Sequence, residues 1–86
     1  MFKVHKYYGT QRYFIIPPTG YLANRTPHSI EASLMGLSFE DYYKYIKNTF
    51  QSARLTVYPT FISYSLNYSD ADKHMKNLNK LFKKVK

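Results

Sequence analysis

The sequence predicts a single small α+β domain, residues 1–86, in which helices pack on an antiparallel sheet in the order ββααββα. Three observations carry this prediction. Runs rich in Val, Ile, Tyr and Phe occur in pairs near the amino terminus and again over 54–66. The segments that follow each pair carry helix-start signals. The chain has 86 residues, of which 44% are hydrophobic, which suffices for one modest core.

The first predicted element is a β-hairpin formed by residues 2–8 and 12–16. Both runs are rich in β-branched and aromatic residues, and Gly9 lies in the short gap between them. Side chains alternate along a strand, so Phe2 and Val4 should share one face, while Lys3, His5 and Tyr7 share the other.

Three helix starts are predicted from capping patterns. The expected N-caps are Thr26, Ser38 and Ser69. An acid stands three residues after the second and third of these caps, as in a capping box. All five acids of the chain fall in the first one or two turns of a predicted helix: Glu31, Glu40, Asp41, Asp70 and Asp72. There they would offset the positive end of the helix dipole.

The first two helices are expected over residues 27–35 and 39–51. Gly36 should end the first helix in left-handed geometry, with Leu37 folding back onto it. The apolar residues of the second helix recur at helical spacing and form one wide stripe: Phe39, Tyr42, Tyr43, Ile46 and Phe50.

The run over residues 54–66 is strand-like but contains Pro59. Proline cannot donate to a ladder, so the run is either a tight hairpin or one edge strand with a break. We favour two strands.

The segment over residues 28–47 resembles the helix-turn-helix motif of DNA-binding proteins. Ala32 matches its small-residue position and Gly36 its turn, while Met35, Leu37, Tyr42 and Tyr45 match its apolar positions. The resemblance implies that the second helix faces the groove of DNA with Ser38, Phe39, Glu40, Tyr43, Lys44 and Lys47. The alternative is a pair of helices joined by a glycine turn, which many α+β domains contain.

The candidate catalytic residues form no recognisable set. The chain has no cysteine, which excludes disulfides, thiolate zinc sites and thiol catalysis. The histidines His5, His28 and His74 lie in different predicted elements without metal-ligand spacing, and we interpret them as surface or half-buried residues. We therefore expect no enzyme, no cofactor and no metal site.

The closing helix separates its apolar and basic residues. Ala71, Met75, Leu78, Phe82 and Val85 form an apolar stripe. The lysines of the opposite side are Lys73, Lys76, Lys80, Lys83 and Lys84. They form a ridge about 15–18 Å long at 1.5 Å per residue. Lys44, Lys47 and Arg54 complete the candidate binding set, and the net charge of +8 favours a polyanionic partner.

Basic residues that alternate with aromatic ones offer another binding surface. The candidates are Lys3, His5, Tyr7, Arg12, Tyr13, Tyr58, Phe61, Tyr64 and Tyr68. Exposed rings could stack on the bases of a single strand or form a protein-binding face. The alternative is that these tyrosines build the core, with their hydroxyls at its edge.

Two functions follow from these patterns. The first is a small basic, non-enzymatic protein that contacts nucleic acid through the lysine ridge. The alternative is a phage or mobile-element protein that binds an acidic surface of a host or defence complex and inhibits it, as anti-CRISPR proteins do. No run approaches the roughly 18 apolar residues of a membrane span, so we expect no membrane partner and a cytoplasmic location, including the cytoplasm of a phage's host cell.

Overall fold

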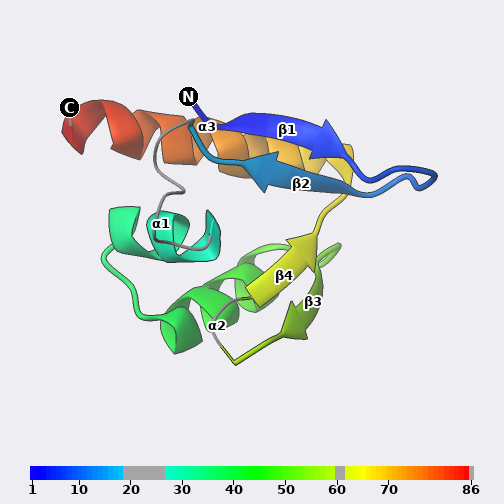
Figure 1. Cartoon of the computed structure of the whole chain (residues 1–86), viewed down its shortest axis with the longest axis horizontal. Coiled ribbons are helices and arrows are strands. Elements are labelled where there is room, and N and C mark those ends of the chain that lie inside the picture. Colours follow the sequence, from blue (N-terminus) through cyan, green and yellow to red (C-terminus); the bar gives the residue numbers. More distant parts are fainter. Residues whose placement is uncertain (19–26, 60–61, 86) are drawn as a thin grey trace.

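The computed structural model describes residues 1–18, 27–59 and 62–85, and its elements follow the predicted order ββααββα (Figure 1). The strands are β1 (Lys3–Lys6), β2 (Tyr13–Ile16), β3 (Arg54–Val57) and β4 (Ile62–Ser65). The helices are α1 (Pro27–Leu34), α2 (Phe39–Thr49) and α3 (Tyr68–Val85). The α+β class is confirmed, and so is the interpretation of residues 54–66 as two strands.

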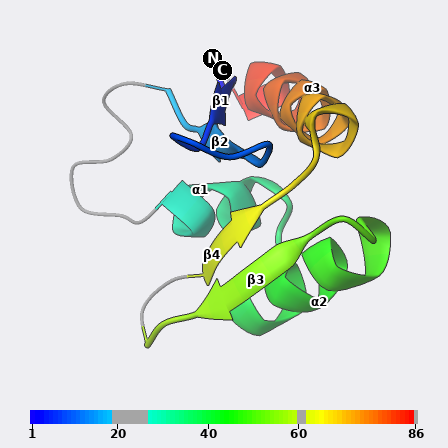
Figure 2. The same cartoon turned by 90° about the vertical axis from the view of Figure 1, so that its right-hand side faces the viewer.

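The strands form two separate antiparallel hairpins instead of one continuous sheet (Figure 2). β1 pairs with β2 from Lys3↔Ile16 to Lys6↔Tyr13, and β3 pairs with β4. The hairpins meet at one isolated bridge, where Tyr13 and Leu66 exchange two backbone hydrogen bonds of 2.8 Å. The ladder ends there because α3 begins directly after residue 67.

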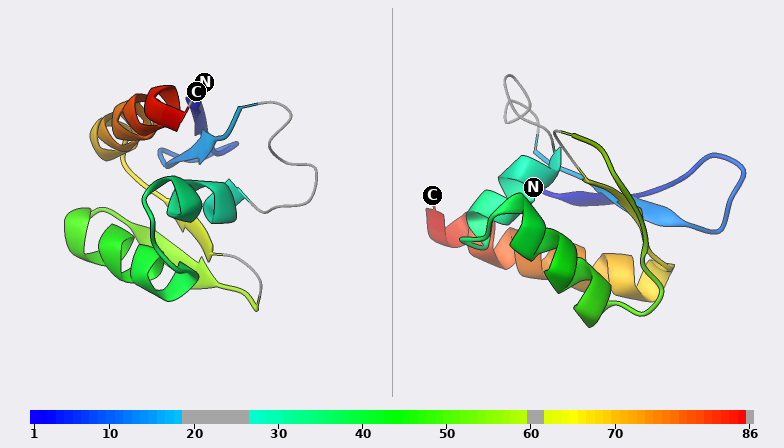
Figure 3. Two further views of the ribbon diagram at one scale, coloured as in Figure 1. Left: turned by 90° about the vertical axis from the view of Figure 1, so that its left-hand side faces the viewer. Right: turned by 90° about the horizontal axis from the view of Figure 1, so that it is seen from below.

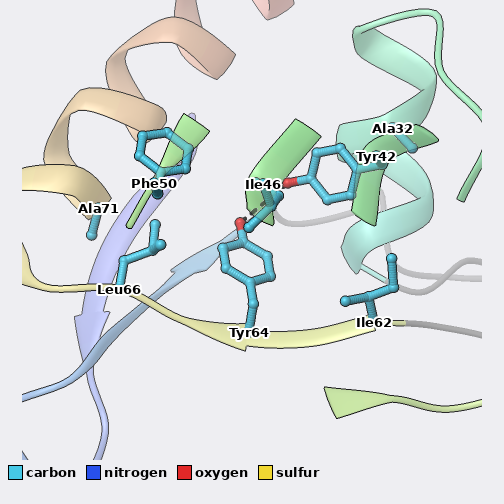
Figure 4. Close-up of a cluster of buried hydrophobic side chains, with 8 residues drawn as sticks. All are labelled: Ala32, Tyr42, Ile46, Phe50, Ile62, Tyr64, Leu66 and Ala71. Atoms are coloured by element: carbon cyan, nitrogen blue, oxygen red, sulfur yellow. Dashed lines mark hydrogen bonds between the residues drawn. The ribbon is translucent and has the colours of Figure 1, made fainter. Parts of the chain in front are cut away.

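The hydrophobic core has two parts. One lies among α1, α2, β4 and the start of α3 (Figure 4), with the buried residues Ala32, Tyr42, Ile46, Phe50, Ile62, Tyr64, Leu66 and Ala71. The other joins the β1–β2 hairpin to α1 and α3 through Phe2, Ile15, Ile30, Leu78 and Phe82. Asn79 of α3 fixes this contact, since it accepts from the backbone N of Phe2 at 2.7 Å and donates to its carbonyl at 3.1 Å. Phe2 is buried and Val4 half-buried, so the face that they were predicted to share lies toward the core.

The predicted end of α1 is confirmed. Gly36 has φ of +70°, the left-handed conformation that glycine adopts without strain. Its N–H donates to Ser33 O at 3.0 Å, and Leu37 N donates to Ala32 O at 2.9 Å. These two bonds satisfy carbonyls at the helix end and fold Leu37 back onto α1.

The helix caps agree with the sequence at α2 but not at α3. Ser38 Oγ accepts from Asp41 N at 3.2 Å, as predicted. At α3 the predicted cap Ser69 is wrong: the helix begins at Tyr68, and Asn67 Oδ1 accepts from Asp70 N at 2.8 Å. Asparagine caps as well as serine, and Asn67 stands earlier in the chain, so Ser69 falls inside the first turn. The predicted cap Thr26 lies outside the described residues.

Replacing Asn67 with alanine should lower the free energy of unfolding by about 1 kcal/mol, because the Asp70 N–H loses its acceptor. Ser69→Ala is the matched control and should change stability by at most about 0.5 kcal/mol, as is usual for surface positions. Urea denaturation of both variants measures the difference. A larger loss for Ser69→Ala than for Asn67→Ala would contradict the assigned cap.

Candidate functional site

Four polar side chains from four elements meet in the core, and we call them the buried cluster: Glu31 of α1, Tyr42 of α2, Tyr64 of β4 and His74 of α3. The Tyr42 and Tyr64 hydroxyls both donate to Oε2 of Glu31, the second at 2.9 Å. Their oxygens lie 3.3 Å apart, joined by the dashed line in Figure 4. His74 Nε2 lies 2.9 Å from Tyr42 Oη. Because Tyr42 gives its one hydrogen to Glu31, Nε2 is the donor in that contact.

The buried cluster is closed to solvent. The exposed fractions are 0% for Glu31 and Tyr42, 1% for His74 and 2% for Tyr64. Burial, together with the nearby Glu31 carboxylate and its hydrogen bonds, raises the pKa of Tyr42 and of Tyr64 well above the usual value of 10.0. A substrate cannot reach these groups, so the arrangement fastens α1, α2, β4 and α3 to one another.

The buried cluster corrects three interpretations of the sequence. Glu31 is not a helix-start charge, since its carboxylate accepts two tyrosine hydroxyls inside the core. His74 is fully buried instead of lying at or near the surface. Tyr64 is also buried and therefore cannot stack on a base. His5 is exposed as expected, and the side chain of His28 lies outside the described residues.

The predicted polarity of α3 is confirmed for the described side chains. Ala71, Leu78 and Phe82 are buried and Met75 is half-buried, while the side chain of Val85 is not among those described. All the predicted ridge lysines are exposed: Lys73, Lys76, Lys80, Lys83 and Lys84. We call these residues the lysine ridge. Within the described part of the chain one of them has an ion-pair partner, Lys76, whose Nζ lies 2.9 Å from Asp72 Oδ2.

Lys44 and Lys47 do not join the lysine ridge. Tyr45 of α2 faces α3, with its ring centroid 6.1 Å from that of His74. Tyr43 lies about 200° away around the helix, and Lys47 Nζ stands 5.9 Å from its ring centroid. The left view in Figure 3 shows α2 and α3 as separate helices, and α1 contacts each of them. Lys44 and Lys47 are exposed on the side of α2 that faces away from α3.

A hollow of about 720 Å³ lies on this side of α2, between the start of α2 and the end of β3. We call it the α2 hollow. Its lining is mainly apolar and aromatic, with Glu40 and Lys44 as its charged residues. Three large apolar side chains there are exposed: Phe39 at 37%, Val57 at 62% and Tyr58 at 46%. An exposed apolar patch of this kind is a feature of protein-binding surfaces.

Arg54 lies on a different surface again. It is exposed at the start of β3 and lines a shallow hollow of about 370 Å³ below the turn of the β1–β2 hairpin. We call this the hairpin hollow. Arg12 lines the same hollow, but it is half-buried, and its Nη2 donates to the carbonyls of Ser52 and, at 3.0 Å, of Ser65. Arg12 therefore also ties the two hairpins together.

The remaining aromatic candidates divide by exposure. Tyr58 and Tyr68 are exposed, while Tyr7 and Tyr13 are half-buried. Tyr13 packs on Tyr68 with centroids 5.3 Å apart, and Tyr7 packs on Phe14 at 4.6 Å. Phe61 lies outside the described residues.

Within residues 1–18, 27–59 and 62–85, no three His, Asp or Glu side chains gather closely enough to hold a metal ion. No helix in the same ranges is long and apolar enough to cross a bilayer.

The sequence did hold a signal for the buried cluster. His74 stands three residues after Ala71 and four before Leu78, so it lies on the apolar stripe of α3. Glu31 likewise stands three residues before Leu34 and four before Met35, so it lies on an apolar side of α1. A titratable residue on an apolar stripe predicts a buried polar contact, although not its partner. No protein-family model, curated protein or solved structure matches this chain.

Proposed function

We propose that this protein is a non-enzymatic nucleic-acid-binding protein that holds the phosphate backbone on its lysine ridge. The observation that carries the proposal is the exposure of all five ridge lysines on the outer side of one 18-residue helix. The ridge spans about 16 Å from Lys73 to Lys84, at 1.5 Å per residue. Asp72 is the one acid paired with it among the described residues.

Folding alone does not account for the lysine ridge. Lys83 and Lys84 lie in the last turn of α3, where positive charge stabilises the helix through its dipole. Lys73, Lys76 and Lys80 lie before that turn, and the dipole effect fades within one turn of the helix end. Their side chains contribute little to the core because they are exposed. A polyanion is the ligand that matches five such charges on one side.

The lysine ridge would bind by neutralising phosphates. Each lysine that contacts a phosphate releases a counterion, so binding should weaken steeply as salt rises. Lysine is a flexible point charge and the ridge presents no fixed donors to base edges, so it would bind without reading sequence. The buried cluster is closed to solvent, so its titratable groups cannot reach a substrate. This supports a binding role for the protein over a catalytic one.

Neutralising two ridge lysines in the variant Lys80→Gln/Lys83→Gln should weaken binding to an oligonucleotide roughly tenfold or more at low salt. The slope of log K against log[salt] should fall by about 1.4 for a single strand or about 1.8 for a duplex, because each phosphate contact contributes ~0.7 or ~0.9. Fluorescence anisotropy with a labelled oligonucleotide over a salt series measures both quantities.

The matched control for this experiment is Lys44→Gln/Lys47→Gln, which removes the same charge from the exposed side of α2. It should change the affinity and slope much less than the ridge variant does. Equal losses in the two variants would show that net charge matters and the ridge does not. Wild-type affinity in the ridge variant would contradict the proposal.

A second candidate function is binding to a protein partner, as an inhibitor of a host or defence complex would require. The α2 hollow favours it, because Phe39, Val57 and Tyr58 expose apolar surface together there. Such a partner would use a surface other than the ridge. It becomes the leading interpretation if the ridge variant keeps wild-type affinity for nucleic acid.

A further inference from the structure

We infer that the hairpin hollow holds one nucleotide of a single-stranded nucleic acid, so that the ligand of the protein is a single strand and not a duplex. The inference rests on the proposed function and names its ligand class. It is carried by three properties of the hollow: its hydroxyl-lined floor, its two arginines and its exposed tyrosine.

The floor of the hollow is the outer face of the β3–β4 hairpin. Leu55↔Tyr64 and Val57↔Ile62 are cross-strand pairs, and Tyr64 and Ile62 are buried, so these pairs belong to the inner face. The alternate pairs Arg54↔Ser65 and Thr56↔Ser63 therefore share the outer face. This face offers one guanidinium and three hydroxyls, which suit the polar atoms of a sugar and a phosphate.

The two arginines make the hollow a site for an anion. Arg54 is exposed at one side. Arg12 is held in place by its bonds to Ser52 and Ser65, which use Nε and Nη2, and its guanidinium lines the hollow. The described lining contains no Asp or Glu, and the first acid of the chain is Glu31. A planar, preorganised guanidinium without a competing carboxylate is a favourable phosphate site.

The rings at the rim favour an unpaired base. Tyr8 lies in the turn of the β1–β2 hairpin and is fully exposed, at 103%. Tyr7 beside it is fixed, since its hydroxyl donates to Tyr64 O at 3.2 Å and its ring packs on Phe14. An exposed ring next to a phosphate site is the arrangement with which proteins stack single-stranded bases. The bases of a duplex are stacked on one another and cannot present a face to Tyr8.

The placement of the two surfaces also favours a flexible ligand. Figure 2 shows α3, which carries the lysine ridge, on one side of the β1–β2 hairpin and the β3–β4 hairpin on another. The molecule measures 33 × 25 × 23 Å along its principal axes, so a strand that joins the two surfaces must curve around it. Duplex DNA has a persistence length of about 150 bp and resists such curvature, whereas a single strand does not.

The test compares a labelled oligo(dT) strand with a duplex of the same length and with oligo(U). Wild type should bind either single strand more tightly than the duplex. Tyr8→Ala should weaken single-strand binding roughly 5- to 100-fold, the usual effect of removing one stacked base, and should leave duplex binding unchanged. Arg54→Gln should also weaken single-strand binding. The chain has no tryptophan, so quenching of tyrosine fluorescence reports stacking directly, and Tyr8→Ala should reduce it.

Tyr58→Ala is the matched control, because Tyr58 is exposed on the α2 hollow instead. It should bind oligo(dT) as wild type does. The inference is overturned if Tyr8→Ala and Arg54→Gln keep wild-type affinity for the single strands, or if wild type prefers the duplex. Either result leaves the ridge proposal standing, provided that Lys80→Gln/Lys83→Gln still weakens binding. If none of these variants loses binding, both the ridge proposal and the inference on the hairpin hollow are overturned.

Discussion

Replacing Glu31 with alanine should destabilise the fold by about 2–6 kcal/mol, because two buried hydroxyls lose their acceptor and each unsatisfied group costs about 1–3 kcal/mol. The Glu31 carboxylate accepts the hydroxyls of Tyr42 and Tyr64, and both would lose their acceptor inside the core. A small domain has only about 5–15 kcal/mol of total stability, so this variant should be near the limit of folding. Urea or thermal unfolding followed by circular dichroism measures the loss.

Two further variants keep that experiment interpretable. Glu40→Ala removes an exposed acid at the start of α2 and should cost no more than about 1 kcal/mol, its interaction with the helix dipole. Glu31→Gln keeps the size of the side chain and one carbonyl acceptor, so its cost should fall between the two. If Glu31→Ala and Glu40→Ala cost the same, the buried cluster does not stabilise the fold.

The parts of the fold that were predictable from sequence depend on local rules. Gly36 ends α1 because a left-handed residue is needed there, and that need is visible in the sequence itself. The apolar stripe and lysine ridge of α3 follow from helical spacing alone. The sequence predicts the wrong cap for α3 because Asn67 and Ser69 are both good N-cap residues. The choice between them depends on where the chain, after leaving β4, is positioned to start the helix.

The parts that were not predictable depend on how elements meet. Glu31 and His74 are 43 positions apart, and only the packing of α1 on α3 places them in one core. The same holds for the candidate sites. The sequence groups Lys44 with the lysine ridge by charge alone. In the fold, α2 is rotated so that Tyr45 packs on His74 of α3, and Lys44 therefore faces away from α3 and lines the α2 hollow. Arg54 and Arg12 share a hollow only because the two hairpins join at Tyr13 and Leu66.

Raising the pH above about 10 should destabilise the protein by about 2.7 kcal/mol per pH unit through Tyr42 and Tyr64 together, about 1.4 for each. In the unfolded chain a tyrosine loses its proton near pH 10. In the folded chain burial raises the pKa of both hydroxyls well above that value. Between these two limits the folded state holds more protons than the unfolded state, so its stability falls as pH rises. Below pH 10 both states are protonated and the contribution is constant.

The urea midpoint and slope, measured at a series of pH values on both sides of 10, give the free energy of unfolding at each pH. Tyr64→Phe removes one of the two hydroxyls and should reduce the alkaline slope by about 1.4 kcal/mol per pH unit. Tyr8→Phe is the matched control, since the Tyr8 side chain is fully exposed, and its slope should equal that of wild type. Lysines also lose charge in this range, but they do so equally in all three proteins. An identical slope in wild type and Tyr64→Phe would mean that Tyr64 ionises as easily in the folded protein as in the unfolded chain, against its burial beside Glu31.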